Sequence, residues 1–139
     1  MPVGDLPLSR RAARSVLDEV RGAHAVVTRD HAVLLGLVAD LVEEMAVALG
    51  VPADGDPADM ARSGRFAGDP VEAVVTEVST ALHVGAHRAR VLVQDAMALT
   101  RDLPGTYGLL RAGSVGPEQA RAVVTGTAGL TPEQTRWVD

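Results

Sequence analysis

The chain of 139 residues contains no cysteine. This absence excludes a disulfide framework, thiolate metal ligands and a cysteine nucleophile. Aromatic residues are nearly absent too, with one Trp, one Tyr and one Phe, so large rings cannot anchor the core. There is no lysine either, which excludes a P-loop. Hydrophobic residues, mostly Ala and Val, make up 47% of the chain. This composition predicts a folded chain whose elements pack closely.

Positive charge is also in short supply. Thirteen basic residues, all Arg, stand against eighteen acidic ones, for a net charge of −5. A net acidic chain is a poor general nucleic-acid binder, because phosphates must be neutralised by cations. Residues 82–139 are the exception, since arginines slightly outnumber carboxylates there. Only this part of the chain could face a phosphate backbone without net repulsion.

No targeting or membrane segment is predicted. The first residues lack the basic end and apolar run of a signal peptide. The most apolar stretch, Ala32 to Leu49, is interrupted by Asp40, Glu43 and Glu44. Each of these carboxylates would cost roughly 2.5–3.5 kcal/mol near the centre of a bilayer. We therefore expect a buried helix, a cytoplasmic location and no membrane partner.

Two helices are predicted in residues 1–50, forming an N-terminal helical hairpin. Ser9 can cap a first helix that runs to about Val27. Asp30 can cap a second helix that ends near Leu49, before a glycine and a proline. Apolar residues cover more than half the circumference of this second helix, which places it in the middle of a bundle.

Residues 51–68 are dense in Gly, Pro and Asp, and predict one long linker. A helical turn is expected within it, around Ala58 to Arg62. The linker could also be a boundary between two units. We favour a single domain over residues 1–139, because neither half alone offers enough area to bury.

Residues 69–139 read as a series of short helices without strand signals. The first begins at Asp69-Pro70, where a capping carboxylate precedes a proline, and ends near His83. Further helices are expected from Ala86 to about Asp102, from Thr106 to Ala112, and from Pro117 and Pro132 onward. The predicted fold is therefore all-α, with about six or seven helices. Because the last helix has completed hardly two turns at Asp139, we expect that the chain is truncated.

A search for catalytic groups finds none that converge. His83 and His87 have the spacing of a metal-binding pair, but Gly85 lies between them and a third ligand is not evident. The carboxylate pairs Asp18-Glu19 and Glu43-Glu44 are adjacent in sequence, so on a helix their side chains diverge. No enzyme, metal site or cofactor is predicted for this chain.

The segment from Glu77 to Leu92 follows the hydrophobic template of a helix-turn-helix. The fit is partial, because the usual turn glycine falls on His83 and Gly85 comes two residues later. The plainer interpretation is an αα-hairpin packed by small residues. The alternative is a hairpin that contacts DNA through its second helix.

If DNA is bound, four residues of that second helix are the candidates: His87, Arg88, Arg90 and Arg101. They lie on or beside the face opposite the predicted packing stripe, which consists of Ala86, Ala89, Leu92, Val93, Ala96, Leu99 and Leu103. A helix N-terminus also favours an approaching phosphate. In the competing interpretation Arg88 and Arg90 pair with nearby carboxylates at the surface, which is worth about 0–1 kcal/mol.

An ordered series of short motifs in residues 69–139 resembles the domain-of-unknown-function 222 family of actinobacteria, also called the thirteen-E-twelve repeat family. The series consists of Glu77-Val78, Ala81-Leu82, Ala89, Leu103-Pro104, Thr106, Leu109-Leu110, Ala112-Gly113, Glu118 to Ala122, Leu130-Thr131 and Glu133. The resemblance implies a helical region that commonly precedes a C-terminal HNH endonuclease module. That module needs His and Asn residues, and this chain has no Asn and no His after His87.

Two functions follow as hypotheses. The first is a non-catalytic helical module of an HNH endonuclease-type protein, which positions the nuclease on DNA or on a partner. The second is a protein-interaction or oligomerisation module without nucleic-acid contact, which the net charge of −5 favours. The partner is therefore DNA in one hypothesis, and another protein or a second copy in the other.

Overall fold

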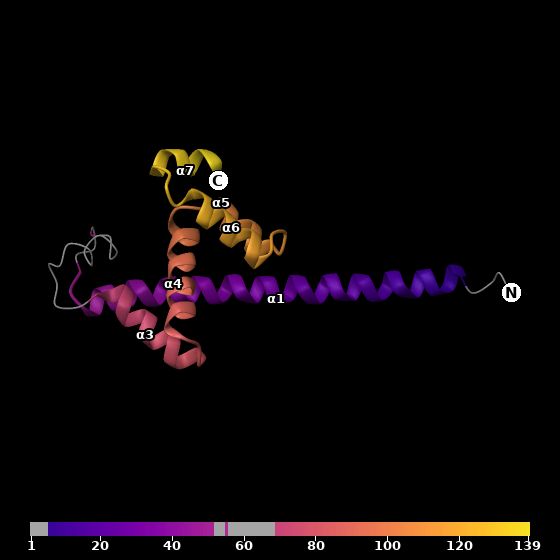
Figure 1. The fold of residues 1–139 in the computed structure, drawn as a ribbon, viewed down its shortest axis with the longest axis horizontal. Helices are drawn as coiled ribbons and strands as arrows, with labels where there is room; N and C mark the ends of the chain where they lie inside the picture. Colours follow the sequence, from indigo (N-terminus) through magenta and orange to yellow (C-terminus); the bar gives the residue numbers. More distant parts are fainter. Residues whose placement is uncertain (1–5, 52–54, 56–68) are drawn as a thin grey trace.

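The computed structural model describes residues 6–51, Gly55 and residues 69–139. These residues form helices and no strand, which confirms the predicted all-α class. The described helices are α1 (Leu6–Ala48), α3 (Pro70–Leu82), α4 (Ala86–Arg101), α5 (Pro104–Ala112), α6 (Pro117–Thr127) and α7 (Pro132–Val138). Figure 1 shows α4 running across α1, with the remaining helices gathered around this crossing. The linker expected over residues 51–68 lies almost wholly outside the described residues.

The predicted N-terminal hairpin is wrong, because α1 is one continuous helix of 43 residues. Ser9 and Asp30, expected to cap two separate helices, both lie inside it. Between Gly22 and Gly36 the chain has neither glycine nor proline to interrupt a helix. A Ser or Asp in a helix interior lowers helix stability by only a few tenths of a kcal/mol relative to Ala. Such a residue alone therefore does not end a helix whose backbone hydrogen bonds can continue beyond it.

The core is built from small and medium aliphatic side chains, as the composition predicted. Its central layer comes from the second half of α1, which packs on α3, α4 and α5. Four alanines in the core are fully buried, so helix backbones approach each other closely. Most of the stripe predicted on the second hairpin helix is buried, although Ala86 is exposed and Leu92 only half-buried. The buried cluster contains Ala32, Leu35, Val38, Val42, Val74, Val75, Val78, Ala89, Val93, Ala96, Leu99, Leu103, Leu110 and Ala120.

A three-residue turn joins α3 to α4, consistent with the predicted hairpin. Its first residue, His83, is the left-handed C-cap of α3, with φ 53° and ψ 42°. The turn is held where the Val84 N–H donates to the Ser79 carbonyl (3.1 Å) and the Ser79 hydroxyl donates to the Val84 carbonyl (2.7 Å). Histidine thus takes the conformation that glycine usually supplies in a helix-turn-helix, at a cost of about 1–2 kcal/mol.

Candidate functional site

The four residues predicted to contact DNA do not gather on one surface. His87 and Arg88 are exposed in the first turn of α4, next to the hairpin turn. Arg90 is turned toward α3 and Arg101 toward α1, and both are engaged by carboxylates of those helices. The fold therefore leaves one arginine of the four, Arg88, without an ion pair among the described residues.

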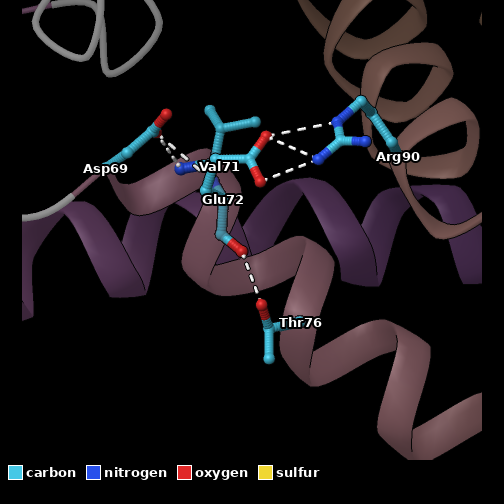
Figure 2. A network of polar contacts seen from close by, with 5 residues as sticks. All are labelled: Asp69, Val71, Glu72, Thr76 and Arg90. Atoms are coloured by element: carbon cyan, nitrogen blue, oxygen red, sulfur yellow. Dashed lines mark hydrogen bonds and ion pairs between the residues drawn. The ribbon is translucent and has the colours of Figure 1, made fainter. Parts of the chain in front are cut away.

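The contact of Arg90 is the more extensive one (Figure 2). Its guanidinium donates to both carboxylate oxygens of Glu72, with N–O distances of 2.8, 3.0 and 3.2 Å. Glu72 is fixed in the first turn of α3 because the Asp69 carboxylate caps that helix, accepting from the Val71 N–H (2.9 Å) and the Glu72 N–H (3.3 Å). The Glu72 carbonyl in turn accepts from the Thr76 hydroxyl (3.1 Å). This two-pronged ion pair is the arrangement expected in the competing interpretation of Arg90.

Arg101 lies near the C-terminal end of α4, with its guanidinium 3.5 Å from the Glu43 carboxylate of α1. Its side chain is only 27% exposed. A phosphate approaching this arginine would have to compete with Glu43 and would reach only part of the guanidinium.

A cavity of about 310 Å³ opens where α1, α4 and α6 meet the hairpin turn. Its lining combines aliphatic side chains with charged or titratable groups from three helices. Arg88 is one of the lining residues, together with two carboxylates, so it does not belong to a continuous basic face. The lining residues are His31, Leu34, Leu82, Val84, Arg88, Val91, Leu92, Asp95, Pro117, Glu118 and Arg121.

An ion pair beside this cavity links α4 to α6, and His31 of α1 lies in the same lining. The Arg121 guanidinium donates to the Asp95 carboxylate at 3.1 Å. Burial raises the pKa of Asp95 above its ordinary value, although the charges of Arg121 and His31 oppose this. Burial lowers the pKa of His31, against the attraction of Asp95. His31 therefore favours its neutral form and forms no charged pair with Asp95 at neutral pH.

The sequence alone does not point to this polar cluster, and none of its members, His31, Asp95 and Arg121, was predicted as a site residue. The three residues come from three helices and are separated by 64 and 26 positions, so no spacing pattern could bring them together. No group of three or more potential metal ligands occurs in the described parts of the chain.

The first half of α1 is bare. Every described side chain from Arg10 to His24 is exposed, and Figure 1 shows this half of the helix extending far beyond the other helices. It nevertheless carries an apolar stripe, with exposed fractions of 58% at Val16, 57% at Val20 and 63% at Val27. No helix of the described residues is both long and apolar enough to cross a membrane.

Comparison with known proteins gives one match. Residues 37–137 match the model of a family described as a domain of unknown function, DUF222. No curated protein and no solved structure matches the chain. The matched region contains the end of α1 from Leu37 onward, helices α3 to α6 and nearly all of α7, and it excludes the bare first half of α1.

Proposed function

The chain belongs to the DUF222 family, whose function is undefined, so we propose a task from its own geometry: it is a non-catalytic helical module that binds another protein chain. The binding surface is the bare segment, residues 10–27 of α1. The observation that carries this proposal is the exposed apolar stripe on a helix whose side chains from Arg10 to His24 are all exposed.

Two physical arguments support this surface. An isolated helix of this length is marginal in water, since most helical stability in proteins comes from packing an apolar face. A contiguous exposed apolar stripe on a soluble domain is also a recurring sign of a protein-binding surface. A partner that covers Val16, Val20 and Val27 would supply the missing packing and stabilise the helix.

The wider context we propose is the one that the family resemblance implies, a helical module that serves an HNH endonuclease-type protein. This chain contributes no catalytic group to that chemistry. Its task there would be to hold the nuclease on a partner chain.

Site-specific photo-cross-linking in cells tests the proposal. A photoreactive amino acid is placed at Val20, on the stripe, and separately at Arg11, which is exposed on the other side of the same helix. We expect protein adducts from position 20 and few from position 11. Equal labelling from both positions, or adducts with nucleic acid alone, would contradict a protein-binding stripe.

DNA positioning is the second candidate, because Arg88 has no ion pair within the described part of the chain and lies in the exposed first turn of α4, next to a turn of helix-turn-helix type. Its test is a titration with duplex DNA at several salt concentrations. Phosphate contacts would give a steep fall in affinity with rising salt. The protein-binding proposal expects no specific DNA affinity.

A further inference from the structure

The stripe of the bare segment has the spacing of a coiled-coil seam. Its apolar positions, Ala13, Val16, Val20, Ala23 and Val27, follow one another at alternating intervals of three and four residues. This spacing keeps a seam facing one partner helix along its length. Seven and eleven residues after Val27, Leu34 and Val38 lie on about the same face of the helix and pack into the core. The bare segment is therefore the uncovered end of a stripe whose other end packs on the core.

We propose that the helix covering this end is the bare segment of a second copy of the chain, running antiparallel. The proposal rests on the proposed function and names its partner. Each copy of α1 would lie along the other from about residue 10 to residue 26, with the two-fold axis passing near Asp18.

The order of side chains along the seam fits this arrangement. The order of residue types along the seam is Ala, Val, Val, Ala from either end. Ala13 and Ala23 are equally far from Asp18, and so are Val16 and Val20. In the antiparallel pair Val16 meets Val20 of the second copy, and Ala13 meets Ala23. Small residues then face small residues, and the helices can approach closely at both ends of the contact. A two-fold interface requires such self-complementarity.

The flanking position Leu17 strengthens this register. It lies beside the seam at the same level as the axis, so the two copies of Leu17 meet each other. Leu17 is 46% exposed in the single chain, and its burial in the pair adds apolar area at the centre of the contact.

A parallel pair does not fit the position of the core. Because the stripe continues under α3, α4 and α5, parallel copies would bring both cores to the same level on the facing sides of two adjacent helices. In the antiparallel pair the two cores lie toward opposite ends of the contact instead. The fully exposed part of α1, from Arg10 to His24, spans about 22 Å at about 1.5 Å per residue and lies between them.

The charges beside the seam are alike rather than complementary. Glu19 lies on the edge opposite to Leu17 and faces Glu19 of the second copy, while Arg10 faces His24. The first pair repels at neutral pH, and salt screens this repulsion. We therefore expect the association to strengthen with salt, which is opposite to the behaviour of a DNA-binding protein.

The contact is small. Two helices in contact over this length bury about the area at the lower end of specific interfaces, roughly 1,200 Å². We expect a dissociation constant in roughly the micromolar range rather than the nanomolar range.

Sedimentation equilibrium of the full chain, from about 5 to about 500 µM, tests the proposal. The chain is expected to shift from monomer to dimer over this range. Val20→Glu is expected to raise the dissociation constant of the dimer at least about tenfold, because each copy then places one carboxylate in the apolar seam. Val33→Glu is the matched control, since Val33 is as exposed as Val16 (58%) but lies on another side of α1. A control that weakens the dimer as much as Val20→Glu overturns the proposal.

Two further outcomes separate this proposal from the proposed function. A chain that stays monomeric at the highest concentration overturns the second copy as partner, whereas protein adducts from position 20 would still support a protein-binding stripe with a different partner. Glu19→Gln removes the like-charge contact and is expected to tighten the dimer about threefold and to reduce its salt dependence. A dimer that weakens in salt, with Glu19→Gln without effect, contradicts the register.

Discussion

The contact between α1 and α5 predicts an unusual response to a glycine substitution. The Tyr107 hydroxyl of α5 donates to the Ala32 carbonyl of α1 at 2.9 Å. One turn further along α1, Gly36 leaves the space that this hydroxyl occupies, since a Cβ built at Gly36 would lie 2.6 Å from the Tyr107 Oη. The single tyrosine of the chain therefore holds α5 against α1, with its hydroxyl packed directly on Gly36.

In an open helix interior, Gly→Ala raises the free energy of unfolding by about 1 kcal/mol. At Gly36 the added methyl group must displace the phenol, which loses a hydrogen bond worth about 0.5–1.5 kcal/mol and disturbs packing at a cost of about 1–3 kcal/mol. We expect Gly36→Ala to destabilise the protein by about 1 kcal/mol. In a Tyr107→Phe background the clashing oxygen is gone, and Gly36→Ala should stabilise by about 1 kcal/mol instead. The predicted coupling is thus about 2 kcal/mol.

Urea unfolding of the four proteins, followed by helical circular dichroism, measures this coupling. Gly108→Ala is the control, because a Cβ at this exposed glycine of α5 meets nothing within 4 Å. It should stabilise the protein equally in both backgrounds. If Gly36→Ala has the same effect with Tyr107 and with Phe, to within about 0.5 kcal/mol, the described approach of α5 to α1 is refuted.

Three further predictions address the core, the cavity and the arginines. Ala89→Leu or Ala96→Leu should lower the free energy of unfolding by roughly 1–3 kcal/mol through overpacking, as urea unfolding would show, and an unchanged midpoint would contradict the α4 interface. Because burial lowers the pKa of His31, its stabilising contribution is present above its ordinary value of 6.5 and is lost as pH falls through the lowered pKa. His31→Gln should remove this loss in thermal unfolding curves between about pH 7 and 4, and curves parallel to wild type would contradict it. Replacing Arg88 and Arg90 together by Ala should leave affinity for duplex DNA at low salt unchanged in an anisotropy titration, whereas a large loss with the fold intact would favour the DNA hypothesis.

The predictable parts of the fold are those in which local signals and packing agree. The start of α3 was predictable because Asp69, Pro70 and Glu72 each favour a helix N-terminus, and Asp69 does accept from the first N–H groups. The packing stripe of α4 was predictable because its apolar residues recur with the helical period. The end of α5 was predictable at Gly113, which takes the left-handed conformation.

The continuity of α1 was not predictable from capping signals, since an aspartate such as Asp30 caps some helices and lies inside others. The difference is decided by tertiary contact. Thr28 is buried at the point where the rest of the chain packs on α1, with a hydroxyl that has no partner among the described residues. Packing of Ala32 and Leu35 beyond it favours a straight helix through this point.

The candidate sites depended on contacts between distant residues. Arg90 could be proposed as a phosphate ligand from its place on α4, but its ion pair with Glu72 depends on how α3 folds back along α4. The polar cluster of His31, Asp95 and Arg121 needs three helices to be placed first. The stripe of the bare segment consists of apolar residues at helical spacing in the sequence, but its exposure depends on where the other helices pack on α1.

Disulfide trapping in the bare segment tests the central claim most directly, and the absence of native cysteine makes single-cysteine variants unambiguous. Ala13→Cys and Ala23→Cys are oxidised in three separate samples: each variant alone, and an equal mixture of the two reduced variants. The antiparallel pair predicts little cross-linked dimer from either variant alone and abundant mixed dimer from the two together. Efficient cross-linking of Ala13→Cys with itself, or no cross-linking in the mixture, would contradict the pairing of α1 with a second copy.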